Sequence, residues 1–157
     1  MRPYTFLVNA SGEYSLCTME EHYPVSYQES ELYQYWFVST GTRSIIKCIQ
    51  FQPLGDFLFN LCLLDYIPEK GELCDQSISN NGDVRVVLWT VAWCVEHHLN
   101  RFPEHIVVFS GNSMGRNKLY MRYIQMHRAK LLSAYIINIL ERNNDEIVFY
   151  VQKKVNL

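Results

Sequence analysis

The residues best suited to bind a ligand lie within positions 107–120, where a short apolar run is followed by two glycines and two basic side chains. This pattern predicts a buried strand, a loop containing Gly111 and Gly115, and the first turn of a helix. The first backbone N–H groups of a helix have no partners within the helix and carry partial positive charge. We therefore expect this junction to attract an anion such as a phosphate group.

Several side chains strengthen that expectation. Ser113 or Asn112 is suited to cap the helix, while Arg116 and Lys118 would add charge-assisted contacts to a phosphate. An aromatic residue beside such cations can stack on a nucleotide base. The predicted ligand-binding residues are Gly111, Asn112, Ser113, Arg116, Lys118 and Tyr120.

The same junction has a purely structural interpretation. The GxxxxGK[ST] and GxGxxG spacings of nucleotide-binding loops are absent from the chain. In this structural interpretation, glycine only supplies a positive φ angle in a capped turn, and Arg116 pairs with an acidic residue of the N-terminal half. Both interpretations remain open at this point.

A second group of acidic and amide side chains precedes the first expected helix and consists of Asn60, Asp65, Asp75, Asn80, Asn81 and Asp83. Carboxylate and amide oxygens suit magnesium or calcium, but the alternating spacing of a calcium-binding loop is absent. The Asn81-Gly82-Asp83 sequence is typical of a turn followed by a helix cap. We expect no metal and no cofactor here, and we expect Asp75 or Asp83 to pair with Arg116 and support the ligand site.

Histidine and cysteine form no recognisable catalytic or metal-binding pattern, because HExxH, GxSxG and CxxC are all absent. The five cysteines are interpreted as reduced packing thiols, and His127 as a core residue of the last helix. A hydrolytic version of the site, such as an RNA-cleaving toxin, would need a general base. The candidates for that base are His105, Asp75 and Asp83.

Charge is distributed unevenly along the chain. Residues 1–100 hold 5 basic and 12 acidic side chains, a net charge of −7, whereas residues 101–157 hold 9 and 4, a net charge of +5. Either two surfaces of opposite charge attract one another, within one chain or between copies, or the C-terminal third binds a nucleotide or nucleic acid. With no signal peptide and no apolar run near the roughly 18 residues that span a bilayer, we expect a cytoplasmic protein without membrane contact.

Periodicity along the chain predicts the elements that must position these residues. The 157 residues fit a single domain, 1–157, with an irregular stretch at 9–30. The expected order is β-β-β-β-α-β-α-β, which is an α+β fold in which two helices pack on a mainly antiparallel sheet built around an N-terminal meander. The expected strands span 4–8, 32–38, 45–51, 57–64, 106–109 and 147–151, and the helices span 84–102 and about 114–142, the latter with a bend near 126–128.

Several of these residues also resemble a recurring pattern in small uncharacterised bacterial proteins, common in Bacteroidetes, that share a domain of unknown function. The resemblance covers roughly residues 30–125. The pattern includes Asn60, Asp65, Asp75, the Asn-Asn-Gly-Asp stretch at 80–83, and the Gly-x-Ser-x-x-Arg-x-x-Leu-Tyr stretch at 111–120. In place of the family's usual Gly-Ser-Thr and the Thr after the arginine, this chain has Asn112, Ser113 and Asn117. The resemblance implies a bacterial cytosolic origin and a fold, but no reaction.

Two functional interpretations follow. In the first, a bacterial cytosolic protein, belonging to a toxin or defence system, binds a phosphate-bearing ligand, nucleotide or nucleic acid, at the loop–helix junction. In the second, the protein is a non-enzymatic interaction module. Its Asp83 and Arg116 loops then form a structural clasp, and the surplus aromatic residues of the meander form a homodimer or partner interface.

Overall fold

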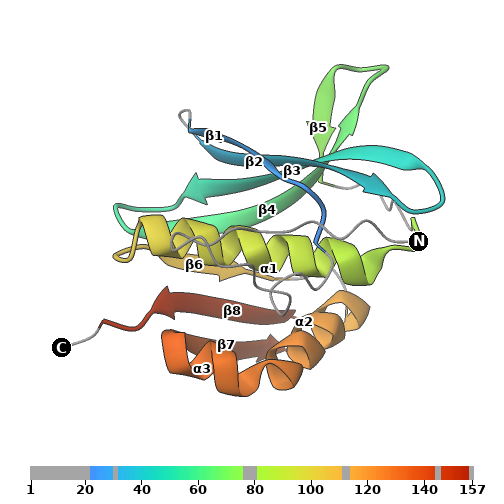
Figure 1. Ribbon diagram of the computed structural model, residues 1–157. Coiled ribbons are helices and arrows are strands. Elements are labelled where there is room, and N and C mark those ends of the chain that lie inside the picture. The colour runs from blue at the N-terminus through green and yellow to red at the C-terminus, as the bar shows by residue number, and fades with distance from the viewer. Residues whose placement is uncertain (1–21, 30–31, 76–80, 111–113, 144–145, 156–157) are drawn as a thin grey trace, which may run out of the picture.

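The computed structural model describes residues 22–29, 32–75, 81–110, 114–143 and 146–155 (Figure 1). Within these ranges the chain forms eight strands and three helices. The strands are β1 (Ser26–Glu29), β2 (Tyr33–Thr40), β3 (Ser44–Pro53), β4 (Leu58–Ile67), β5 (Glu72–Cys74), β6 (Ile106–Phe109), β7 (Tyr135–Asn143) and β8 (Glu146–Lys153). The helices are α1 (Val84–Arg101), α2 (Met114–Met126) and α3 (Arg128–Ala134).

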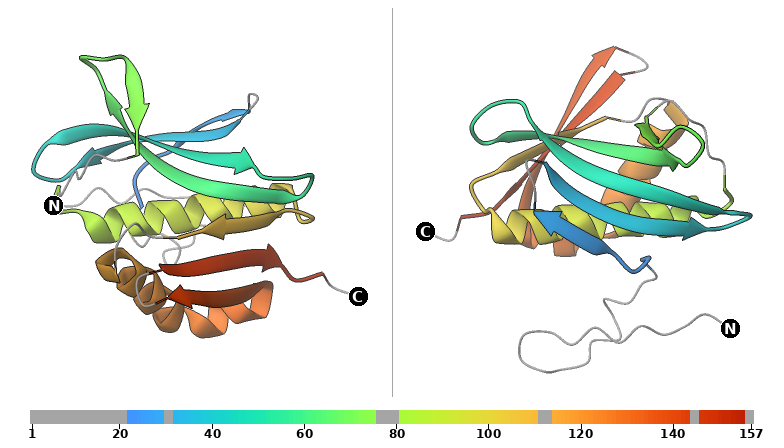
Figure 2. Two further views of the ribbon diagram at one scale, coloured as in Figure 1. Left: turned by 180° about the vertical axis from the view of Figure 1, so that it is seen from behind. Right: turned by 90° about the horizontal axis from the view of Figure 1, so that it is seen from above.

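The described strands belong to one sheet in the order β1-β2-β3-β4-β6-β8-β7, with β5 paired to β4 beside this path. Neighbouring strands are antiparallel except β4 and β6, which run parallel, with α1 in the connection between them. A parallel pair needs such a crossover because the chain must return to the same end of the sheet. All three helices lie on one face, with α1 along the sheet and α2 and α3 over β8 and β7 (Figures 1 and 2).

Helix α1 and the inner face of the sheet form the core. Residues of α1 at three- and four-residue spacing are buried, and alternate residues of the strands meet them. The buried residues of α1 are Val87, Thr90, Val91, Cys94, Val95, His98 and Leu99. The meander contributes its aromatic side chains Tyr35, Phe37, Phe51 and Phe59 to the same cluster. Many of the chain's aromatic residues are therefore explained by the core.

A buried ion pair joins two strands of the meander. Lys47 of β3 and Asp65 of β4 are directly opposite each other in the register, and the Lys47 Nζ lies 2.5 Å from an oxygen of Asp65. Both side chains are almost fully buried, where an ion pair offsets part of the cost of removing each charge from water. Removing one partner would remove this compensation.

The α+β fold and its mainly antiparallel sheet are confirmed. The expected helix over 84–102 and strand over 106–109 correspond to α1 and β6, and the expected bend near 126–128 is the break between α2 and α3. Strands β1 and β5 were not expected. The expected strand over 4–8 lies outside the described residues.

The expected helix over 114–142 is wrong in its last third. The helix ends at Ala134, and Tyr135 begins strand β7. Ile137 lies opposite Val151 and Ile139 opposite Phe149 in an antiparallel pair with β8. The β-branched isoleucines suit this pairing, which the helical spacing of the preceding residues concealed.

None of the described helices is both long enough and apolar enough to cross a membrane.

Candidate ligand-binding site

A polar cavity of about 150 Å³ lies beside the middle of β4. The β4 strand pairs with β6 at Leu58, Phe59 and Asn60, and pairs with β5 from Asp65 onwards. The residues between these two ladders line the cavity. Its described lining residues are Asn60, Leu61, Cys62, Leu63, Asp75, Val91, Phe109, Ser110, Arg116 and Tyr120.

Three elements bring the polar side chains to this cavity. Strand β6 ends at Phe109, so Ser110 lies just beyond the C-terminal end of this strand. Arg116 lies in the first turn of α2, and Tyr120 follows one turn later on the same side of the helix. Asp75 comes directly after β5 and adds an acidic side chain to the lining.

The charges of Arg116 and Asp75 act on different groups of the cavity. Burial raises the pKa of the Tyr120 hydroxyl, and the positive charge of Arg116 offsets only part of this rise. The pKa of the Cys62 thiol is also raised, mainly by burial and to a smaller extent by the negative charge of Asp75. The hydrogen bond from Asn60 opposes this rise. The Asn60 amide nitrogen lies 3.2 Å from the Cys62 sulfur. Tyr120 is therefore close enough to Arg116, and Cys62 close enough to Asp75, for these charges to influence their pKa values.

The structure brings together three of the predicted site residues, namely Arg116, Tyr120 and Asp75, in the lining of one cavity. Lys118 is exposed and does not line it, because a residue two positions after Arg116 points to the other side of a helix. Gly111, Asn112 and Ser113 lie outside the described residues.

The predicted site residues did not include Cys62 and Ser110, and Asn60 was assigned to the acidic and amide-rich group but not to the ligand site. One feature of the sequence was informative: Asn60 is the single polar residue in the apolar run 57–64. A polar residue within such a run either pairs inside the protein or faces a polar cavity. The contribution of Cys62 depends on how β4 is placed in the sheet, which the local sequence does not reveal.

Asn81 and Asp83 lie in a different polar cluster, at the N-terminal end of α1. The Asn81 carbonyl accepts a 2.8 Å hydrogen bond from the Thr42 N–H, and the Asn81 side chain bonds both the N–H and the carbonyl of Arg43, at 2.9 and 2.7 Å. The Asn81 amide also donates to the Ser39 hydroxyl at 2.9 Å. A Cβ atom on Gly41 would lie only 1.9 Å from the Asn81 carbonyl oxygen, so only glycine fits there.

The carboxylate of Asp83 belongs to the same cluster. It accepts hydrogen bonds from the Tyr23 hydroxyl, at 2.5 Å, and from the Ser39 hydroxyl. Asp83 occupies the N-cap position of α1, as expected, but its side chain makes no capping hydrogen bond. We call Tyr23, Ser39, Asn81 and Asp83, together with the turn at 40–43, the α1 clasp. Among the described residues, Asp75 rather than Asp83 shares a cavity with Arg116.

Of the three candidates for a general base, only Asp75 lines the cavity. His105 is buried, lies 3.0 Å from His98 between ring nitrogens, and stacks on Phe59. Burial lowers the pKa of His105. In the described part of the chain, no group of three or more His, Cys, Asp or Glu side chains is placed to hold a metal ion. Cys48, Cys62, Cys74 and Cys94 are free thiols.

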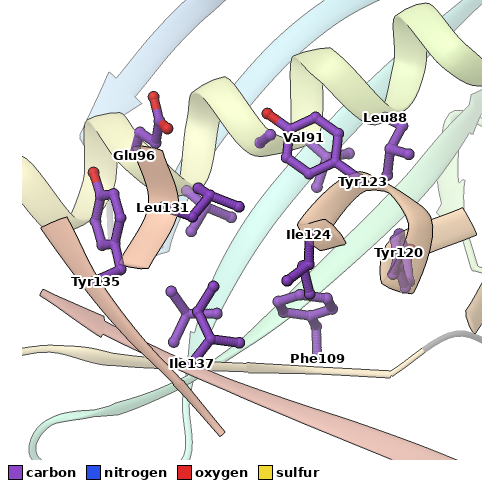
Figure 3. Close-up of a pocket in the computed structure, with 13 residues that line it drawn as sticks. Leu88, Val91, Glu96, Phe109, Tyr120, Tyr123, Ile124, Leu131, Tyr135 and Ile137 are labelled. Carbon is purple, nitrogen blue, oxygen red and sulfur yellow. The ribbon is translucent and has the colours of Figure 1, made fainter. Parts of the chain in front are cut away.

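A smaller, apolar pocket of about 70 Å³ adjoins the polar cavity. It lies between the helices and strands β6, β7 and β8, and its lining shares Val91, Phe109 and Tyr120 with the polar cavity. Figure 3 shows Tyr120 at one end of the pocket and Glu96 and Tyr135 at the other. Burial raises the pKa of Glu96, and burial together with Glu96 raises the pKa of Tyr135 to about 12.

The fold and this pair of cavities define an α+β protein with a polar, ligand-sized cavity at a strand–helix junction. The chain belongs to DUF6934, a family of unknown function, whose profile matches residues 19–157. No curated protein and no solved structure matches the chain.

Proposed function

We propose that the protein binds a small phosphate-bearing ligand in the polar cavity, with Arg116 as its principal anionic contact. The observation that carries this proposal is the placement of Arg116, Tyr120, Asn60 and Ser110 around one cavity of about 150 Å³. Arg116 offers a planar set of donors that matches phosphate oxygens. Its place in the first turn of α2 adds the positive end of the helix dipole.

The remaining polar groups have complementary roles. The Ser110 hydroxyl and the Asn60 amide are neutral donors for further phosphate oxygens. Asp75 repels a phosphate, so its role is to accept hydrogen bonds from a ligand hydroxyl. A ligand that combines one phosphate group with hydroxyl groups satisfies both Arg116 and Asp75.

A cavity supports a small ligand better than a nucleic acid. Nucleic-acid binding depends on several basic side chains that contact successive phosphates along an open surface. The described lining of the cavity contains a single basic residue, Arg116, together with the acidic Asp75. We also propose that the protein is a bacterial cytosolic protein that belongs to a toxin or defence system.

The test is isothermal titration of the full chain with inorganic phosphate, with AMP, and with a short RNA at two salt concentrations. We expect phosphate and AMP to bind, and Arg116→Ala to weaken both by about tenfold or more, since a hydrogen bond to a charged group contributes about 1.5–3 kcal/mol. Arg122→Ala is the matched control, because Arg122 is exposed on the same helix and does not line the cavity.

Two outcomes would overturn this proposal. If the wild type binds neither phosphate nor AMP and Arg116→Ala unfolds, Arg116 is structural and the interaction-module interpretation takes its place. If only RNA binds, with strong salt dependence, the ligand is a nucleic acid on the exposed basic surface rather than a small molecule in the cavity.

A further inference from the structure

We propose that the ligand is a phosphate monoester whose compact apolar group extends past Tyr120 into the apolar pocket. This inference rests on the proposed function, because it places the phosphate group at Arg116. It adds the chemical class of the rest of the ligand.

The adjacency of the two cavities is the first argument. The polar cavity and the apolar pocket share three lining residues, Val91, Phe109 and Tyr120. The Tyr120 ring packs edge-on against Phe109 and Phe149, with ring centroids 5.3 and 5.8 Å away. Tyr120 therefore borders both the polar cavity, which Arg116 lines, and the apolar pocket.

The chemistry of the apolar pocket is the second argument. Apart from Glu96, its lining side chains are aliphatic or aromatic, and they come from all three helices and from β6, β7 and β8. Such a lining offers water few partners, so an apolar group would be favoured there over solvent. Glu96 and Tyr135 close the end opposite Tyr120, which limits how far the group extends (Figure 3).

The size of the pocket sets the size of the group. A dry cavity of about 150 Å³ lined by aliphatic and aromatic residues takes one benzene molecule. The pocket, at about 70 Å³, has about half that volume. It therefore has room for about three or four carbon atoms beyond Tyr120.

A series of alkyl phosphates tests this inference directly. Inorganic phosphate and the methyl, ethyl, propyl, butyl, hexyl and octyl monoesters are titrated into the full chain by calorimetry. Once the alkyl chain passes Tyr120, we expect affinity to rise by about fourfold for each methylene, which corresponds to full burial of that group. The rise should stop after about three or four methylenes, when the chain meets Glu96 and Tyr135.

Two variants that fill the pocket check the position of the alkyl chain. Ile124→Phe and Ala92→Leu add volume at lining residues, from α2 and α1 respectively. Either variant should retain the affinity for inorganic phosphate but lose the dependence on chain length. Leu132→Phe is the matched control, because Leu132 is 37% exposed on α3 and does not line the pocket. The use of two variants guards against one that fails to fold.

The outcomes separate this inference from the proposed function. Equal affinity for phosphate and for all the esters would overturn the inference and leave phosphate binding at Arg116 in place. A dependence on chain length that persists unchanged in both filled variants would also overturn it, because the chain would then lie elsewhere. If neither phosphate nor any ester binds, the proposed function itself is wrong.

Discussion

The N-terminal ends of α1 and α2 both carry polar side chains that the sequence predicts to form a ligand site, yet these side chains differ in their surroundings. At α1, the side chains of Asn81 and Asp83 are occupied by hydrogen bonds to Tyr23, Ser39 and the turn at 40–43. At α2, Arg116 lines a cavity of about 150 Å³. Residue type alone does not distinguish a structural polar cluster from a binding site. The distinction depends on whether space remains beside the polar groups.

The largest expected effect comes from a third polar cluster, the buried pair of His98 and His105. Burial, together with the nearby His105, His97 and Arg101, lowers the pKa of His98 to about 3, so this ring is neutral in the folded protein. In an unfolded chain its pKa is about 6.5, and the unfolded state therefore binds more protons between these two values. Stability should be fully present above about pH 6.5 and fall as the pH drops towards 3.

We expect this loss to approach about 1.4 kcal/mol per pH unit within that window. Chemical denaturation as a function of pH measures it. His98→Phe keeps a ring against Phe51, which lies 4.2 Å away between centroids, and should flatten the pH dependence. An unchanged slope in His98→Phe would show that the His98 ring is not the source of the acid sensitivity. Comparisons of the two helix ends should therefore be made above pH 6.5.

The next largest effect tests the α1 clasp. Asn81 is only 4% exposed and makes hydrogen bonds through its backbone and both ends of its side chain. Asn81→Ala removes the side-chain bonds to the buried Ser39 hydroxyl and to the backbone of Arg43. We expect a loss of about 2–4 kcal/mol in the free energy of unfolding, with phosphate affinity retained.

Urea denaturation measures this loss. Asn138→Ala on the exposed part of β7 provides the matched control, with an expected change below about 0.5 kcal/mol. If Asn81→Ala is as stable as this control, the contacts of the clasp do not hold the structure together.

The smallest effect concerns Asp75, the acidic residue among the described lining residues of the cavity. Asp75 is exposed, and its negative charge opposes that of a bound phosphate. Asp75→Asn should therefore strengthen the binding of inorganic phosphate by about two- to fivefold, the range expected for an exposed charge interaction. Asp56→Asn, at an exposed position between β3 and β4, should leave it unchanged. Weaker phosphate binding in Asp75→Asn would show that Asp75 orients Arg116 rather than opposing the anion.

Local sequence patterns predicted the parts of the fold that local interactions decide. Residues of α1 recur at helical spacing and Pro103 follows its end, so its boundaries were predicted closely. For β7 the local pattern was misleading, because the apolar spacing of α2 and α3 continues as far as Tyr135. The choice of strand depends on pairing with β8, and such tertiary pairing overrides local preference.

The same difference applies to the site. Arg116 and Tyr120, one helical turn apart, could be predicted to act together because their spacing is local. Cys62 reaches the cavity through the register of β4 in the sheet, and Asp83 meets Tyr23 and Ser39, which are 60 and 44 positions away in the sequence. No periodicity in the sequence encodes these contacts.

The most direct test of the contrast between the two helix ends is to measure phosphate affinity and the free energy of unfolding in both Arg116→Ala and Asn81→Ala at pH 7.5. We predict that Arg116→Ala loses about tenfold or more in affinity and changes stability by less than about 1 kcal/mol. Asn81→Ala should show the reverse. If the wild type binds phosphate and Arg116→Ala binds it with the same affinity, the account is contradicted, because Arg116 would then not hold the anion in the cavity.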